Sequence, residues 1–261
     1  MAEVQIHPSA IVEPGAELGQ GVRIGPFCHV GPQVRLEDGA VLKSHVVVTG
    51  DTHIGPDTVI FPFACIGELP QDLKFRGERT MLRIGARNRI REYVTMHPGT
   101  EGGGGLTSVG DDGLFMASCH VAHDCRIGNR VILVNSVAVA GHCVLEDGVI
   151  VGGLSGVHQF VRIGRGAMIG AVTMVTADVL PHALVQGPRG HLDGLNLVGL
   201  KRAGATRADI TALRDLLAAL AGGSLRETAR KRAEREVSVL EREVLDFILA
   251  PTERSFLTPQ G

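Results

Sequence analysis

Aliphatic residues recur at every sixth position over most of the chain, and this repeat limits the possible folds more than any other feature. The series begins at Ile6, is interrupted between residues 66 and 84, shifts by one residue between 96 and 109, and ends at Val175. No polar residue enters it; its members are Ile6, Val12, Leu18, Ile24, Val30, Leu36, Leu42, Val48, Ile54, Ile60, Ile66, Ile84, Ile90, Met96, Val109, Phe115, Val121, Ile127, Leu133, Val139, Leu145, Val151, Val157, Ile163, Ile169 and Val175. A period of six is typical of a parallel β-helix, in which each coil buries its inward face against its neighbours.

The composition agrees with such a solenoid. The 261 residues include 35 glycines, one Tyr and no Trp, so small and aliphatic side chains must fill the core. Three hexads make one triangular coil, and about nine coils fit between residue 6 and roughly residue 186. Glycine often follows the aliphatic residue, as at Gly25, Gly55 and Gly128, and we expect it to supply unusual backbone angles at the corners. The cysteines expected in the small inward position are Cys28, Cys119, Cys125 and Cys143.

The repeat predicts an all-β solenoid over residues 1–190, with two segments leaving it as projecting loops at about 68–83 and 100–108. The second loop contains four consecutive glycines, Gly102 to Gly105, but lacks the pattern of a phosphate-binding loop. We interpret it as a flexible lid or an interface loop.

A different periodicity marks the C-terminal part. Beyond Gly194 the apolar residues recur about every 3.6 positions, which predicts a small α-helical domain over residues 191–261. Thr206 and Ser224 are the expected N-caps of its helices.

Charge and cysteine content exclude several classes of protein. Lys and Arg number 26 against 28 Asp and Glu, so no global positive field favours nucleic acid. The N-terminus does not look like a signal peptide, and no run of about 18 apolar residues follows. We expect a soluble, cytoplasmic protein without stable membrane insertion. The five cysteines lack paired spacing, which argues against a disulfide framework or a cysteine zinc site.

Histidines gather on one outer face of the predicted solenoid. The hexads that start at residues 121, 139 and 157 stack in successive coils, because they lie 18 residues apart. Eighteen residues before the first of them lies residue 103, so we expect the glycine-rich loop to overhang this face. The histidines that gather there are His123, His142 and His158, with His120 at the preceding corner. Such a cleft suits proton transfer, because imidazole exchanges a proton near neutral pH.

Two chemistries fit clustered histidines on a β-helix. Metal catalysis needs three imidazoles that converge on one ion, but the spacing expected for a carbonic anhydrase of this repeat class is missing. General-base catalysis needs one imidazole and an orienting carboxylate, and Asp124 directly follows His123. We therefore expect no metal, while a carbonic-anhydrase-like enzyme and a non-catalytic hexapeptide scaffold stay open as alternatives.

Eight segments resemble the UDP-N-acetylglucosamine O-acyltransferases that begin lipid A synthesis. Together they extend along essentially the whole chain, and AHDC, VHQF and QDLK are far more specific than the repeat alone. The segments are IGPFCHVGP at 24–32, LKSHVVV at 42–48, IGELPQDLKF at 66–75, RNRIRE at 87–92, HVAHDCRIGN at 120–129, AGH at 140–142, VHQF at 157–160 and GLKRAG at 199–204.

The resemblance implies a left-handed β-helix, a homotrimer with active sites between neighbouring subunits, and no cofactor. It implies transfer of a 3-hydroxyacyl group from acyl carrier protein to the sugar 3-hydroxyl, with His123 as general base, Asp124 as its orienting partner and the Gly141 N–H as oxyanion donor. By resemblance, the substrate-binding residues are Gln71, Asp72, Lys74, His120, His142, His158 and Gln159 for sugar and acyl group, and Asn196 and Arg202 for the nucleotide. The residues expected to limit acyl chain length are Met168 and Ala171.

Two positions depart from the family pattern. Val198 stands where many members carry Glu, and Ala203 where many carry a second Arg. A 3-amino analogue of the sugar is therefore an alternative acceptor. Acyl carrier protein is acidic, and the run expected to face it is Arg226, Arg230, Lys231 and Arg232.

Overall fold

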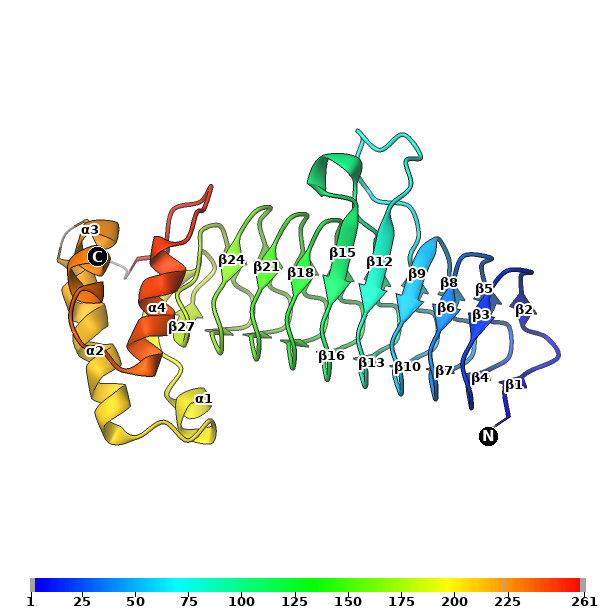
Figure 1. Cartoon of the computed structure of the whole chain (residues 1–261), viewed down its shortest axis with the longest axis horizontal. Coiled ribbons are helices and arrows are strands. Elements are labelled where there is room, and N and C mark those ends of the chain that lie inside the picture. Colours follow the sequence, from blue (N-terminus) through cyan, green and yellow to red (C-terminus); the bar gives the residue numbers. More distant parts are fainter. Residues whose placement is uncertain (1–2, 223, 259–261) are drawn as a thin grey trace.

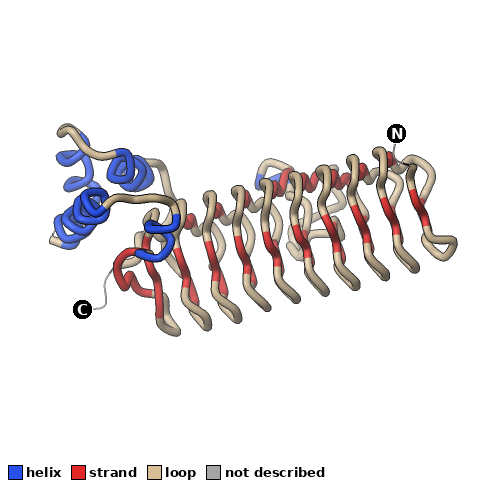
Figure 2. The backbone as a smooth tube through the Cα atoms, turned by 90° about the horizontal axis from the view of Figure 1, so that it is seen from below, coloured by secondary structure: helices blue, strands red, loops and turns tan. Residues whose placement is uncertain are grey.

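The computed structural model describes residues 3–222 and 224–258, which form a long β-helix with helices at one end. The chain winds through three parallel sheets, which form the three sides of a long prism. The first coils and the helices lie at opposite ends of this prism (Figure 1). Seen from below, successive coils stack as evenly spaced rungs (Figure 2). The predicted parallel β-helix is confirmed.

Most strands contain only two residues, one facing inward and one outward. Sheet A contains β1 (Gln5–Ile6), β4 (Arg23–Ile24), β7 (Val41–Leu42), β10 (Val59–Ile60), β13 (Arg89–Ile90), β16 (Leu114–Phe115), β19 (Ile132–Leu133), β22 (Ile150–Val151), β25 (Met168–Ile169), β27 (Ala183–Gln186) and β28 (His191–Leu195). Sheet B contains β2 (Ile11–Val12), β5 (His29–Val30), β8 (Val47–Val48), β11 (Cys65–Ile66), β14 (Thr95–Met96), β17 (His120–Val121), β20 (Ala138–Val139), β23 (Gly156–Val157) and β26 (Met174–Val175). Sheet C contains β3 (Glu17–Leu18), β6 (Arg35–Leu36), β9 (Asp51–Ile54), β12 (Met81–Ile84), β15 (Leu106–Val109), β18 (Arg126–Ile127), β21 (Val144–Leu145) and β24 (Arg162–Ile163).

The register of the sheets follows the hexad. Each aliphatic residue pairs with its equivalent in the next coil, for example Val121 with Val139 and Val139 with Val157. This stacking buries an almost entirely apolar core, in which Cys125 and Cys143 are fully buried, as expected for the inward cysteines. Away from the ends of the β-helix, a two-residue strand is stable because coils on both sides supply its hydrogen bonds.

Most glycines that follow the aliphatic residues do not play the role expected from the sequence, although Gly67 has a positive φ of 84°. Gly25, Gly55 and Gly128 do not have positive φ, whereas 16 of the described residues other than glycine do, including Phe27 and His45. A Cβ on Gly55 would lie 2.5 Å from the Gly85 carbonyl carbon of the next coil. Glycine is needed there for the close approach of two backbones, and not for its backbone angles.

Two loops project from one side of the β-helix near its middle (Figure 1). The first follows β11 and ends where β12 begins at Met81, slightly earlier than expected. The second follows β14, contains the 3₁₀ helix η1 (Glu101–Gly103) and ends at β15. Met96, and not residue 103, precedes Val121 in sheet B. The count that placed residue 103 there was wrong, because the second loop is an insertion outside the coil. The expected position of the loop over this face is confirmed, since Thr100 donates two hydrogen bonds to Asp124.

The helices cover the C-terminal end of the prism. They are α1 (Leu197–Arg202), α2 (Arg207–Ala221), α3 (Leu225–Ala233) and α4 (Val239–Leu249). The first helix begins at Leu197 and not at residue 191, because β28 folds back on β27 as an antiparallel hairpin and extends sheet A. Thr206 caps α2 through its side chain, whereas Ser224 precedes α3 without a side-chain cap bond.

A buried ion pair fastens the helices to the β-helix. Asp178 is fully buried and accepts hydrogen bonds from the Arg162 backbone N–H and Nε, both at 2.8 Å. Thr252, which follows α4, donates to the same carboxylate at 2.7 Å. Arg162 also lies over the Phe247 ring of α4. None of the helices in the described part of the chain is long and apolar enough to cross a membrane.

Candidate active site

His123 and Asp124 form a buried pair at the corner that follows β17. The two side chains are joined by a 2.8 Å hydrogen bond between Nδ1 of His123 and Oδ2 of Asp124, and each residue is about 5% exposed. A carboxylate at Nδ1 favours the tautomer in which Nδ1 carries the proton. Nε2 is then left as the nitrogen that can accept a proton from a bound substrate.

The glycine-rich loop holds Asp124 in place. The backbone N–H of Thr100 donates to Oδ1 of Asp124 at 2.9 Å, and the Thr100 hydroxyl donates to Oδ2 at 2.6 Å. From β15, the Thr107 hydroxyl accepts the Asp124 N–H at 2.7 Å. A Cβ on Gly103 would collide with the Asp124 carboxylate, so the loop packs closely there. The loop thus supports the pair, and nothing in the sequence pattern pointed to either threonine.

His142 lies one coil further along, beside His123. Its ring meets the His123 ring edge to face with centroids 5.0 Å apart, and stacks on Phe160 at 4.4 Å. Burial lowers the pKa of His142, while the nearby Asp124 carboxylate opposes that shift. His142 is therefore neutral at neutral pH and can donate or accept a hydrogen bond. Phe160 belongs to the VHQF segment but was not among the predicted site residues.

Gly141 lies directly against the His123 ring. A Cβ at this position would be 2.6 Å from Cε1 and 2.7 Å from Nε2 of His123. Among the described residues, no group accepts a hydrogen bond from the Gly141 backbone N–H, although the N–H groups of Ala140 and His142 are both bonded. This N–H is available to a ligand beside the imidazole.

A cleft of about 690 Å³ lies between the two projecting loops and the His142 corner. Asp72 accepts a hydrogen bond from the backbone N–H of Lys74 at 2.9 Å, and this bond lowers the Asp72 pKa. The predicted Gln71 does not line the cleft. Its lining residues are Asp72, Lys74, Phe75, Arg76, Gly77, Glu78, Thr100, Glu101, Gly102, His142 and Phe160.

Two further histidines lie next to the pair. His120 is in strand β17, and not at a corner as expected; its Nδ1 is 2.8 Å from the Thr95 hydroxyl. Its ring packs edge to face on His97, with centroids 4.9 Å apart. His97 is buried, and its Nδ1 has no hydrogen-bond partner among the described residues. Burial lowers the pKa of His97 to about 4, so His97 is neutral at neutral pH.

We expect His97 to make the folded state sensitive to acid. Its pKa lies near 4 when folded and near 6.5 when unfolded, so the stability it contributes is complete above pH 6.5 and falls as the pH drops toward 4. Between pH 7 and pH 4.5 the free energy of unfolding should decrease by about 2.5 kcal/mol on this account. His97→Phe should remove that decrease in denaturant titrations at both pH values, and exposed His7→Phe should retain it. Equal decreases in all three proteins would contradict the assignment.

Several predicted residues do not line this cleft. His158 is exposed, and its Nδ1 is 2.7 Å from Nη2 of Arg254. Asn196 caps α1 and donates to the Gly166 carbonyl, while Arg202 lies exposed at the end of that helix. Met168 and Ala171 belong to sheet A and the corner after it, whereas His123 follows a strand of sheet B. Within one chain, none of these residues lines the cleft beside His142.

Three of the four basic side chains in the run on α3 already have partners within the chain. Arg232 binds the buried Glu241 at 2.6 Å, Lys231 pairs with Glu227 at 2.8 Å, and Arg226 donates to the Ala250 carbonyl. Most of this charge stabilises the helices.

His123, Asp124 and His142 are also close enough to hold a metal ion, since their ligand atoms lie within 4.8 Å of one another. Three hydrogen bonds already occupy the Asp124 carboxylate, from His123 and from two donors of Thr100. A metal would have to displace at least one of them. The arrangement therefore fits an oriented base better than a metal centre.

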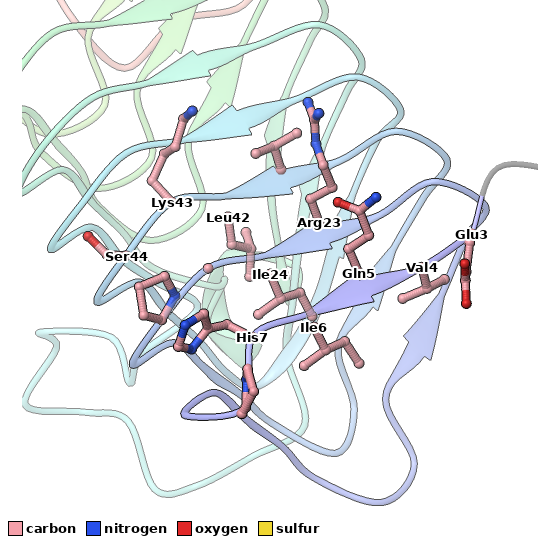
Figure 3. A pocket seen from close by; sticks show the side chains of 14 residues that line it. Glu3, Val4, Gln5, Ile6, His7, Arg23, Ile24, Leu42, Lys43 and Ser44 are labelled. Carbon is pink, nitrogen blue, oxygen red and sulfur yellow. The ribbon is translucent and has the colours of Figure 1, made fainter.

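A second hollow lies on sheet A near the N-terminus (Figure 3). Arg23 and Lys43 extend from neighbouring coils, and His7 lies below them in this view. Among the described residues, the His7 ring is hydrogen-bonded only to the hydroxyl and the backbone N–H of Ser9. The imidazole therefore lacks an orienting carboxylate. This hollow does not have the features of a proton-transfer site.

Sequence comparisons find relatives that match nearly the whole chain. Residues 178–257 match the family model for domain 2 of UDP-N-acetylglucosamine O-acyltransferase, and residues 15–50 match the bacterial transferase hexapeptide repeat. A Paracoccus denitrificans protein named acyl-acyl-carrier-protein UDP-N-acetylglucosamine O-acyltransferase is 75% identical over 259 residues, covering 99% of both chains. A protein of the same name from Rhizobium johnstonii is 49% identical, covering 98% of this chain and 95% of the other.

Solved structures give the same result. A crystal structure of a UDP-N-acetylglucosamine acyltransferase superposes with a TM-score of 0.95 at 41% identity, over 98% of this chain and all of the other. The UDP-N-acetylglucosamine acyltransferase of Campylobacter jejuni gives 0.92 at 36% identity, with the same coverage. The predicted left-handed β-helix with a small helical C-terminal part is confirmed by this similarity. The chain belongs to the UDP-N-acetylglucosamine O-acyltransferase family.

Proposed function

We propose that this protein transfers a 3-hydroxyacyl group from acyl carrier protein to the 3-hydroxyl of UDP-N-acetylglucosamine, the first step of lipid A synthesis. The observation that carries the proposal is the buried His123–Asp124 pair beside a cleft, in a chain 75% identical to a relative with that name. A sugar hydroxyl is a weak nucleophile until a base removes its proton. An oriented imidazole supplies that base.

In the proposed step, His123 accepts one proton from the sugar hydroxyl and later donates it to the leaving thiolate. Nε2 of His123 takes the proton of the sugar hydroxyl as the oxygen attacks the thioester carbonyl. The Gly141 N–H, free of other partners among the described residues, donates to the oxyanion. The C–S bond then breaks, the ester C–O bond is complete, and the imidazolium returns its proton to the departing thiolate. Asp124 stabilises the imidazolium and fixes its orientation.

The remaining substrate-binding roles follow the family pattern. We infer that Asp72, Lys74 and His142, which line the cleft, hold the sugar and the acyl group, together with Gln71, His120, His158 and Gln159. Asn196 and Arg202 are proposed to bind the nucleotide of a UDP-sugar whose sugar lies in the cleft of a second copy of this chain. Because Met168 and Ala171 lie on another sheet than His123, an acyl groove that includes them needs a neighbouring chain. The homotrimer and the cytoplasmic location stay predictions of this account.

The identity of the acceptor has a specific test. Val198 is exposed and Ala203 lies at the end of α1, so neither can replace the ionic contacts of many family members. The protein should be assayed with a 3-hydroxyacyl carrier protein and either UDP-N-acetylglucosamine or its 3-amino analogue. We expect faster transfer to the hydroxyl acceptor. Faster transfer to the amine would identify the 3-amino analogue as the substrate. Transfer to neither acceptor would support the non-catalytic scaffold alternative.

Acyl chain length is expected to respond to Ala171. Replacing this exposed residue by glycine removes one methyl group from the proposed end of the acyl groove. When a pocket gains room for one methylene, its discrimination between acyl chains that differ by one methylene changes by about 1 kcal/mol, or several-fold in rate. Ala171→Gly should therefore shift the preference toward longer chains when a series of acyl donors is compared. Identical profiles for both proteins would contradict the assignment.

Chelation should leave the activity unchanged. The Asp124 oxygens are already bonded to His123 and Thr100, so catalysis by this cluster requires no ion. Dialysis against a chelator, followed by a transfer assay with and without added Zn²⁺, should give the same rate in both cases. A loss on chelation that Zn²⁺ restores would show that the His123, Asp124 and His142 cluster works as a metal centre and would contradict the general-base assignment.

A further inference from the structure

The segment after α4 returns to the β-helix beside the proposed site. Asp178 pairs with this segment: its N–H donates to the Ser255 carbonyl at 2.7 Å, and its carbonyl accepts the Leu257 N–H at 2.9 Å. The Thr252 hydroxyl accepts the Arg254 N–H at 3.1 Å and donates to the Asp178 carboxylate. The backbone around Arg254 is therefore fixed at both sides.

The Arg254 guanidinium contacts the VHQF corner with two of its nitrogens. Nε donates to the Gln159 carbonyl at 3.0 Å, and Nη2 donates to Nδ1 of His158 at 2.7 Å. A guanidinium cannot accept a hydrogen bond, so Nδ1 of His158 must be unprotonated in this contact. His158 then carries its proton on Nε2.

The Gln159 carbonyl is the end of a column of peptide groups that leads to His123. The same peptide unit contains the Phe160 N–H, which donates to the Gly141 carbonyl at 3.1 Å. The next unit contains the His142 N–H, which donates to the His123 carbonyl at 3.0 Å. Hydrogen bonds in such a chain polarise one another. Arg254 places a positive charge at the carbonyl end of the column.

In a continuing solenoid, the next coil would supply this donor. The corresponding N–H is that of Asp178, but it donates to Ser255 instead. Arg254 takes the place of the missing backbone donor and adds a contact to a side chain that an amide N–H could not make.

We propose that Arg254 is a positioning residue for acyl transfer. Its Nε is the terminal donor of the column formed by the peptide groups that follow Gln159, Gly141 and His123, and its Nη2 holds His158 with Nε2–H directed to substrate. This proposal rests on the proposed function of the cleft. It assigns to the C-terminal segment a role in catalysis that the basic run on α3 does not have, since Arg254 acts through two groups of the β-helix. The loss of its contacts should therefore lower kcat more than it affects binding of the carrier protein.

The test compares Arg254→Met and Arg254→Lys with Arg23→Met, which removes an exposed arginine of β4 far from the cleft. Charge-assisted hydrogen bonds of this kind support roughly a 10- to 30-fold effect. Arg254→Met should lose about that much in kcat, with the KM for carrier protein changed less than about twofold. Lysine can serve only one of the two acceptors and should recover part of the loss. A raised KM for carrier protein at unchanged kcat would overturn the proposal in favour of a docking contact.

A double-variant cycle with His158→Ala separates positioning from support of the fold. If Arg254 acts through the His158 corner, adding Arg254→Met to His158→Ala should cost much less than it costs alone. Full additivity would overturn the role through His158. Nitrogen NMR of histidine-labelled protein gives a readout independent of turnover: the His158 signals should report the Nε2–H tautomer in the unaltered protein and a mixture in Arg254→Met. If transfer is absent but this change occurs, the proposed function fails while the contact stands; an unchanged His158 signal refutes the positioning itself.

Discussion

His123→Ala should lower kcat for acyl transfer by about 1,000-fold, within the range that general bases contribute. Among the described residues, His123 is the only imidazole of the His120, His123 and His142 cluster that is hydrogen-bonded to a carboxylate, at 2.8 Å. Without it, the sugar hydroxyl must attack while still protonated. Steady-state rates at saturating donor and acceptor measure the effect.

The matched control is His45→Ala, because His45 is exposed on another corner between Phe27 and Phe63. It should retain nearly full activity. Circular dichroism and the unfolding midpoint should show that His123→Ala is folded. A folded His123→Ala protein that keeps more than about a tenth of the activity would rule out His123 as the base.

Gly141→Ala should lower kcat by about 100-fold through geometry alone. The added Cβ would lie 2.6 Å from Cε1 of His123, closer than two carbon atoms can approach, so the ring must turn away from its position. A displacement of about 1 Å in a catalytic group can cost this much. The KM for the UDP-sugar should change far less, and steady-state kinetics separate the two constants.

Gly31→Ala is a suitable comparison for this glycine. Its Cβ would approach no atom more closely than the Thr49 hydroxyl, at 3.3 Å, and that side chain can move. The variant should be as active as the unaltered protein. If Gly141→Ala were equally active, the close packing of Gly141 on His123 would have no catalytic importance.

The fold could be predicted from the sequence because the hexad repeats along the core. Each aliphatic position determines both the inward face and the register, so one pattern specifies three sheets. The repeat could not give the role of its glycines, since coil-to-coil distances such as that between Gly55 and Gly85 appear only when the coils are stacked. It also misplaced the residue before Val121, because the inserted loop adds residues without adding a coil.

The site could be predicted only where its residues are close in sequence or belong to a coil. His123 and Asp124 are adjacent, and His142 follows in the next coil, so the repeat brings them together. Thr100 lies in the inserted loop, and Arg254 reaches His158 from a segment almost a hundred residues away. No periodic pattern connects these residues to the cluster. Their contacts depend on the tertiary structure of the inserted loop and of the C-terminal segment.

The most direct test of the central claim is the product formed from a 3-hydroxyacyl carrier protein and UDP-N-acetylglucosamine, identified by mass spectrometry and NMR. The account predicts a UDP-sugar with one new ester at the 3-position, formed at a rate that depends on His123. Absence of any acylated sugar, from either acceptor, with a folded protein and a loaded donor would contradict it.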